Sequence, residues 1–253
     1  MSKLKKDSDK IEIINTLSKC IKIYDENLKN KKVMFIVENK KRKLEIEEMF
    51  FGKRNFYHLT GVKVLDKTGK ELSSNNFYDL LLKSRINYSK FVKKDNTTDL
   101  KLQVLPQLMK IDRIANMIGE YDVTKIFLQT DKIAGNINAC MGFVRDKRLK
   151  LYVPNTALKK DIRQITSIRN KIIAILKKDS RDKLYSNITY LKQNYNIIDI
   201  LKNEEINKKI DIENIYSTDK RINSKISDFI NVNSKILLSN KAENRLFSAS
   251  QKN

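Results

Sequence analysis

Apolar residues recur at helical spacing near the start of the chain, at Ile13, Leu17, Ile21 and Tyr24, behind a basic tail. Asp9 stands where this helix would begin, and an aspartate there can accept hydrogen bonds from the first free backbone N–H groups. The next apolar run, residues 33–37, is too short and too rich in β-branched side chains for a helix. It therefore predicts a buried strand.

A turn of four consecutive cations at residues 40–43 follows this strand, and apolar positions at residues 44, 46 and 49 predict a second one. Residues 52–55 would turn the chain into a third strand over residues 55–61. Successive side chains of a strand point to opposite faces, so His58 and Thr60 would share a face, one pleat apart, before Gly61 ends the strand. We therefore expect an antiparallel meander of three strands.

The middle of the chain predicts two helices, one from residue 75 to about 86 and one from about residue 98 to 114. Pro106 inside the second helix indicates a kink or a later start. Strands are expected at residues 125–129, 137–145, 149–153, 172–176 and 188–191, with a charged turn at residues 146–148. A turn that closes the hairpin is predicted at Pro154, Asn155 and Thr156. The pattern predicts an α+β fold, with N-terminal and inserted helices and a largely antiparallel sheet.

Periodicity weakens after Tyr195, where Asn, Lys, Ile, Ser and Asp dominate. We therefore divide the chain into a domain over residues 1–194 and a Lys/Asn/Ile-rich C-terminal extension over residues 195–253. The extension is expected to be helical or partly disordered, and a helical appendage is the favoured interpretation. A chain that ends at residue 194 is expected to stay folded.

Charge indicates the class of partner. Lys and Arg outnumber Asp and Glu by 52 to 30, which gives the 253-residue chain a formal net charge of +22. Such a field attracts polyanions, so nucleic acid is the expected partner, ahead of an anionic membrane surface. No apolar run approaches the ~20 residues that a membrane span needs. The two cysteines suit buried thiols in a reducing compartment, and no signal peptide is evident, so we expect a cytoplasmic protein without a membrane partner.

Several enzyme classes lack support in the sequence. Neither a G-x-G-x-x-G nor a G-x-x-x-x-G-K-[ST] stretch is present, and no G-x-S-x-G elbow could hold a nucleophilic serine. One histidine and two separated cysteines do not form a common zinc site, and the carboxylates are not clustered as magnesium ligands. We therefore expect no metal and no cofactor. Cleavage of RNA through its own 2′-hydroxyl fits the remaining groups, because it needs only a base, an acid and cations.

Four short stretches occur in order along the chain: Phe56-Tyr57-His58-Leu59-Thr60-Gly61, Thr130-Asp131-Lys132, Met141-Gly142-Phe143 and Tyr152-Val153-Pro154-Asn155-Thr156. Over roughly residues 11–192 the chain resembles the phage-associated barnase/EndoU/colicin/RelE-like nuclease families, in particular the fourth clade, whose members carry an F-x-H-L-T-G core. This resemblance implies a helical N-terminal part, an antiparallel sheet and metal-independent ribonuclease activity in toxins or mobile-element proteins. His58 and Thr60 map onto the core motif, while Lys132, Asn155 and Thr156 map onto the later strands.

The residues expected in catalysis are His58, Thr60, Lys132, Tyr152 and Thr156. His58 would act as general base or acid, because its ordinary pKa lies near neutrality. Thr60 and Thr156 would bind phosphate, Lys132 would stabilise transition-state charge, and Tyr152 would donate a proton or stack on a base. Each also has a structural interpretation: a hydrogen-bonded histidine, a β-forming or turn threonine, a solvated lysine, and a core tyrosine.

The residues expected to hold nucleic acid are Lys40, Lys41, Arg42, Lys43, Arg145, Lys147, Arg148, Lys150 and Asn155. RNA is favoured as the ligand, and a cognate antitoxin is a possible protein partner. A different class of function stays open: the same basic body could be a non-catalytic inhibitor from a phage or mobile element. Such an inhibitor would bind nucleic acid or a host defence complex without cleaving anything.

Overall fold

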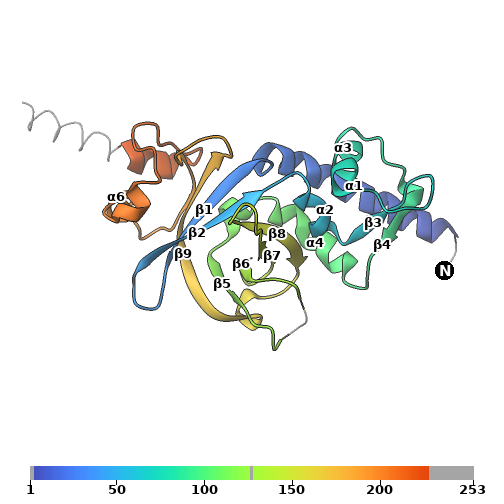
Figure 1. Cartoon of the computed structure of the whole chain (residues 1–253), viewed down its shortest axis with the longest axis horizontal. Coiled ribbons are helices and arrows are strands. Elements are labelled where there is room, and N and C mark those ends of the chain that lie inside the picture. The colour runs from blue at the N-terminus through green and yellow to red at the C-terminus, as the bar shows by residue number, and fades with distance from the viewer. Residues whose placement is uncertain (1–2, 126–127, 228–253) are drawn as a thin grey trace, which may run out of the picture.

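The computed structural model describes residues 3–125 and 128–227, which form helices and a mostly antiparallel sheet (Figure 1). The helices are α1 (Lys3–Asn27), α2 (Asn55–Thr60), α3 (Ser74–Leu82), α4 (Thr98–Leu108), α5 (Ile111–Ile114), α6 (Ile197–Leu201) and α7 (Glu204–Asn207), with 3-10 turns η1 (Tyr88–Lys90) and η2 (Ile162–Gln164). The strands are β1 (Lys31–Glu38), β2 (Leu44–Phe51), β3 (Val62–Val64), β4 (Phe91–Lys93), β5 (Met117–Tyr121), β6 (Lys132–Gly135), β7 (Cys140–Arg145), β8 (Tyr152–Leu158), β9 (Thr166–Asp179) and β10 (Asn187–Leu191). The predicted α+β class with a largely antiparallel sheet is confirmed.

The main sheet closes on itself. Its strand order is β1-β2-β8-β7-β6-β5-β9-β10, and β1 also pairs with β9, so all of these strands except β10 form a barrel-like ring. β2 and β8 are joined by a single parallel bridge between Met49 and Tyr152, whereas the other pairs are antiparallel and longer. The ring therefore has one weakly bonded seam, at β2 and β8.

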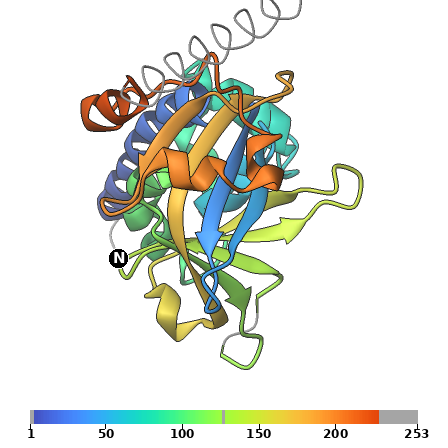
Figure 2. The ribbon, with the colours of Figure 1, turned by 90° about the vertical axis from the view of Figure 1, so that its left-hand side faces the viewer.

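β1 is buried on both faces, which explains its unbroken apolar sequence. Val33, Phe35 and Val37 belong to a core shared with helices α1 to α4, while Met34 and Ile36 belong to a second core. The second core lies against the C-terminal segment, which covers the opposite side of β1 and β9 from α1 (Figures 1 and 2). The long strands thus form a layer between two apolar clusters.

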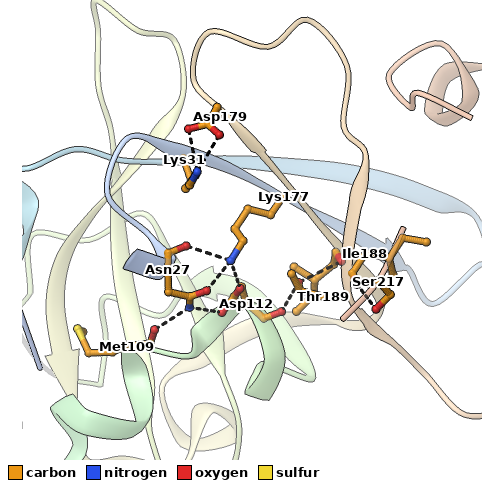
Figure 3. A network of polar contacts seen from close by, with 10 residues as sticks. Asn27, Lys31, Met109, Asp112, Lys177, Asp179, Ile188, Thr189 and Ser217 are labelled. Carbon is orange, nitrogen blue, oxygen red and sulfur yellow. Dashed lines mark hydrogen bonds and ion pairs between the residues drawn. The ribbon is translucent and has the colours of Figure 1, made fainter. Parts of the chain in front are cut away.

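A buried polar network fixes α1 against the sheet (Figure 3). The Lys177 ammonium on β9 lies 2.8 Å from Asp112 Oδ2 and donates to the backbone and side-chain oxygens of Asn27 at the end of α1. Asn27 Nδ2 in turn donates to Asp112 Oδ1 at 2.8 Å and to the Met109 carbonyl at 3.0 Å. Asp112 has no exposed surface, so this pairing removes the large cost of burying its charge alone.

The predicted third strand over residues 55–61 is wrong, because residues 55–60 form helix α2. Asn55 starts it: its Oδ1 accepts from the Gly52 N–H at 2.8 Å, and its Nδ2 donates to the Pro154 carbonyl at 3.3 Å. Gly61 ends it in the left-handed region, with φ of 68°. Residues two apart on a helix point roughly 200° apart. His58 is accordingly exposed while Thr60 is buried, and they do not share a face.

The predicted closing turn at residues 154–156 is also wrong, because these residues continue β8. Gly142 pairs with Thr156 and Phe143 pairs with Pro154, so Asn155 is an extra residue in a β-bulge. Proline has no N–H to donate to a β-ladder, so within sheets it is tolerated at irregular positions such as a bulge.

Other predicted elements hold with shifted boundaries. The helix from residue 98 is divided into α4 and α5, and Pro106 lies inside α4. The strands predicted from residues 137 and 149 begin at Cys140 and Tyr152, and the hairpin of β9 and β10 is confirmed. The strand predicted at residues 125–129 includes two residues outside the described range, and residues 125, 128 and 129 lie in no strand. Among the described residues, no helix is both long and apolar enough to cross a bilayer.

The C-terminal segment completes the second core. Residues that include Ile197, Ile200 and Ile222 are buried against β1, β9 and β10, and residues 220–227 are helical. The segment also pairs with the outer edge of β10, where Ile188 N–H donates to the Tyr216 carbonyl at 2.8 Å. Ser217 Oγ donates to the Ile188 carbonyl at 2.6 Å (Figure 3). The rest of the predicted extension, residues 228–253, lies outside the described range.

This packing changes what we expect of a chain that ends at residue 194. Such a chain should melt well below one that ends at residue 227, because it exposes Met34, Ile36 and Ile188 to water. Loss of a single buried Ile or Leu side chain typically costs about 2–5 kcal/mol, and several are removed here. Thermal unfolding of the two chains, with binding of a hydrophobic dye, measures the difference. Equal melting temperatures would show that the segment does not stabilise the sheet.

Candidate functional site

His58 stands between two adjoining surface hollows at the junction of α2 and β8. One hollow has a volume of about 550 Å³ and the other of about 380 Å³, and His58 and Asn155 line both. Helix α2 presents His58 outward, and the β-bulge turns Asn155 toward the same place. Asn155 is held there because its Nδ2 donates to the Gln129 carbonyl at 2.6 Å.

The first hollow is strongly basic. Its lining includes Arg54, Arg145, Lys147 and Arg148, with Asp146 as the one carboxylate among the lining residues. Asp146 accepts from the Arg54 guanidinium at 2.7 Å and from the Arg148 N–H at 2.9 Å, which fixes the turn between β7 and β8. Three cations then remain beyond this ion pair, so the hollow suits a polyanion.

The second hollow lies on the other side of His58. Its lining includes Glu71, Lys94 and Lys101, with Asn155 and Thr156 from β8. Glu71 accepts from Tyr57 Oη at 3.0 Å and lies 3.6 Å from the Lys63 ammonium. Carboxylate, imidazole and two ammonium groups therefore border one small volume, which is a setting where proton transfer and anion binding can be combined.

The environment of His58 favours its neutral form. His58 is exposed at the surface, but the protein around it partly desolvates the ring, which lowers the pKa of His58. The positive charges of Lys94 and Arg54 lower this pKa further, and Glu71 partly opposes them. A histidine with a lowered pKa is neutral at neutral pH, so it can accept a proton rather than only donate one.

Thr60, by contrast, is used within the fold. Its side chain is fully buried, its Oγ1 donates to the Tyr57 carbonyl at 2.8 Å, and it accepts from the Val62 N–H at 3.3 Å. These hydrogen bonds place its hydroxyl at the C-terminal end of α2, beside Gly61, and Thr60 lines neither hollow. The phosphate-binding role predicted for Thr60 therefore has no support from its position.

The motif around Gly142 packs one wall of the site. A Cβ at Gly142 would lie 2.5 Å from Thr130 Oγ1 and 2.8 Å from Thr156 Cγ2, so only glycine lets these segments lie together. Asp131 continues this contact, since its N–H donates to the Phe143 carbonyl at 2.8 Å and its Oδ2 accepts from the Arg145 N–H at 2.7 Å. This packing places Arg145 and Thr156 at the hollows.

Lys132 lies outside both hollows. Its ammonium is 2.6 Å from Glu47 Oε1 and 2.8 Å from Glu120 Oε1, so it links β6 to β2 across the seam of the ring. Burial lowers the pKa of Lys132, but hydrogen bonds to Glu120 and Glu47 outweigh that effect and raise it. Its position favours a structural role over the predicted catalytic one.

Tyr152 belongs to the same cluster as Lys132. Its ring centroid lies 5.3 Å from Lys132 Nζ and 5.4 Å from the guanidinium carbon of Arg145, within the range of cation–π attraction. It lines neither hollow, so the ring supports Arg145 rather than contacting a ligand there.

The predicted binding residues divide into two groups. Arg145, Lys147, Arg148 and Asn155 line the first hollow, and Lys150 lies in the same turn. Residues 40–43 form the β1–β2 turn. Lys43 directly precedes β2 and is six residues from Met49 at the seam, or roughly 20 Å at the rise of a strand. The two turns project in different directions in Figure 2.

Sequence reasoning missed Arg54, Glu71, Lys94 and Lys101. Glu71, Lys94 and Lys101 are brought to His58 by the packing of α3, β4 and α4 around α2, whereas Arg54 directly precedes α2. Arg54 directly before the F-x-H-L-T-G stretch was the one local signal available.

A family model described as phage-Barnase-EndoU-ColicinE5/D-RelE like nuclease 4, PBECR4, matches residues 16–194. The chain belongs to this family. The match confirms the predicted resemblance, and it covers both hollows and the whole ring of strands. No curated protein and no solved structure matches the chain. The PBECR4 assignment supports a nuclease of this type that acts on nucleic acid.

The PBECR4 match ends near the boundary placed at residue 194, while the second core extends to Ile226. Within residues 3–125 and 128–227, no group of three or more His, Cys, Asp or Glu side chains is arranged as metal ligands would be.

A Lys132→Met substitution should destabilise the fold, because Glu47 would keep its charge in a largely buried place without a partner. We expect a loss of roughly 1–3 kcal/mol in the free energy of unfolding, measured by urea denaturation. Lys31→Met is the matched control, because its ion pair with Asp179 is more exposed and is expected to contribute under ~1 kcal/mol. Equal losses for the two variants would contradict a special structural role for Lys132.

Substitution of Lys94 by Gln should raise the pKa of His58, because it removes a positive charge that disfavours the imidazolium. Glu71→Gln should lower the same pKa, because it removes the opposing negative charge. His58 is the only histidine in the sequence, so its imidazole protons give an unambiguous NMR titration. Lys67→Gln, an exposed position that lines neither hollow, is the control and should leave the titration unchanged. Shifts of the same sign for Lys94→Gln and Glu71→Gln would contradict this account.

Proposed function

We propose that the protein is a metal-independent RNA-cleaving endonuclease that uses the 2′-hydroxyl of RNA as the nucleophile. The observation that carries this proposal is the position of His58, exposed on α2 between two hollows that six cationic side chains border. A polyanionic strand has a place to bind on each side of one titratable group. The family assignment supports a nuclease, and the chemistry of these side chains favours RNA as the substrate.

The reaction needs a base for the 2′-hydroxyl, positive charge at the phosphate and an acid for the leaving oxygen, and these residues can supply the first two. Neutral His58 takes the proton from the 2′-hydroxyl as the 2′-oxygen forms a bond to phosphorus. Arg54 and Arg145 offset the negative charge that grows on the phosphoryl oxygens. The bond from phosphorus to the 5′-oxygen then breaks, and the departing oxygen gains a proton, which solvent can supply at this exposed site. The products are a 2′,3′-cyclic phosphate and a free 5′-hydroxyl.

The biological setting belongs to the same proposal. We propose that the protein acts as a toxin or mobile-element protein that cleaves RNA of the host cell and that an antitoxin partner holds it inactive. The word phage in the family description supports this setting. The alternative, an inhibitor that binds nucleic acid or a defence complex without cleavage, shares the basic hollows but does not need His58.

Purified protein should cleave a mixed RNA pool in the presence of EDTA and leave 2′,3′-cyclic phosphate ends. His58→Ala should lower the rate by ~10²–10⁴ without loss of the fold, which is the usual contribution of a positioned acid–base group. Mapping of the product ends by their resistance to ligation, with and without phosphatase treatment, measures the outcome.

Two results would overturn the proposal. Cleavage that EDTA abolishes and magnesium restores would show a metal-dependent nuclease. RNA binding without turnover in both wild type and His58→Ala would favour the inhibitor. Lys67→Ala, at an exposed position that lines neither hollow, is the control and should cleave at the wild-type rate.

A further inference from the structure

The second hollow contains two lysines that the fold does not neutralise. Lys94 follows β4 and Lys101 lies in the first part of α4, and both line the hollow beside His58. Among the ion pairs formed by the described residues, none involves either lysine. Lys94 is exposed and Lys101 is half-buried. By comparison, the half-buried Lys132 and the buried Lys177 are both paired with carboxylates.

The position of Lys101 is tied to that of His58 through Gly61. The Gly61 carbonyl accepts from Thr98 Oγ1 at 2.6 Å and from the Lys94 N–H at 3.0 Å, so the start of α4 is bonded to the end of α2. The Lys101 stem then crosses Gly61 so closely that a Cβ there would lie 2.9 Å from Lys101 Cδ. Gly61 lies about one helical turn after His58. The fold thus fixes the position of the Lys101 stem relative to the helix that carries His58.

The charge of Lys101 is held at a cost. Burial lowers the pKa of Lys101 and Lys94 repels it, while Asp95 attracts it from beyond ion-pair distance. The Asp95 carboxylate is itself occupied with the N–H and the hydroxyl of Thr97. An anion that entered the hollow would stabilise this ammonium, and none of the described carboxylates forms an ion pair with it.

We propose that Lys101 binds a backbone phosphate of nucleic acid in the second hollow, so that the bound strand runs from the first hollow across His58 and Asn155 to Lys101. This inference rests on the proposed function, because it assumes that the ligand of the His58 site is a polynucleotide. It makes Lys101 a binding residue for a neighbouring phosphate, a role that differs from the transition-state role predicted for Lys132. It also means that the site needs nucleotides on both sides of the reacting phosphate.

The test uses the full-length protein and a single-stranded RNA in which every 2′-hydroxyl is methylated, so that binding is measured without cleavage. Lys101→Met keeps an apolar stem against Gly61 and removes the charge. The slope of log affinity against log salt should become shallower by about 0.7, the value for one phosphate contact on a single strand. Lys101→Arg should keep the wild-type slope, and Lys67→Met, at an exposed position outside the hollow, should do the same.

A second measurement uses the wild-type fold. In protein whose lysines carry ¹³C-labelled methyl groups, the Lys101 signal, assigned by its absence in Lys101→Arg, should titrate at higher pH when the methylated RNA is bound. An unchanged Lys101 titration, or a salt slope equal in wild type and Lys101→Met, would overturn the inference. A Lys101-dependent slope in a protein that cleaves no RNA would leave the inference standing and reject the proposed ribonuclease. Cleavage with no effect of Lys101 on binding would do the reverse.

Discussion

The buried contact between Lys177, Asp112 and Asn27 is the interaction on which the arrangement of the other elements depends (Figure 3). All three protons of the Lys177 ammonium and both protons of the Asn27 amide have acceptors, and Thr189 Oγ1 donates to the Asp112 carbonyl at 2.6 Å. A fully satisfied polar network of this kind specifies one packing, because any other arrangement leaves a buried charge without a partner. It joins α1, α5, β9 and β10, and α4 leads directly into α5. The registration of α4, and with it the approach of Lys101 to Gly61, follows from this anchor.

Local signals in the sequence predicted the elements whose stability is local or whose burial is simple. The helix through Leu17 and Tyr24, the strand at Val33–Val37 and the hairpin of β9 and β10 have regular apolar patterns. Helix α2 was missed because its six residues include several β-prone types, and its helical form depends on Asn55 bonds to Gly52 and Pro154. Gly61, which we took as the end of a strand, is equally the usual residue after a helix.

The candidate site shows the same division. His58 and Asn155 were found because a short motif names them, but their neighbours Glu71, Lys94 and Lys101 carry no motif and reach the site through tertiary packing. Lys132 shows the opposite case. Its motif suggests chemistry, but the two carboxylates that bind it, Glu47 and Glu120, lie far from it in the sequence or on a neighbouring strand. Several motif residues, such as Gly142 and Thr60, instead shape the walls that carry the reactive groups.

Because only the bridge between Met49 and Tyr152 joins β2 to β8, the ring of strands is hydrogen-bonded almost throughout but nearly open at this one pair. Local opening costs the least free energy where the fewest hydrogen bonds must break, so we expect the ring to open first at the β2–β8 seam. This seam lies at the start of β8, the strand that carries Asn155, and next to the β7–β8 turn with Arg145 and Arg148. Spreading at this point would move residues that line the first hollow, while the long antiparallel pairing keeps β1 and β9 together. A sheet that is rigid except at one seam can thus admit a bulky, irregular polymer without a separate lid.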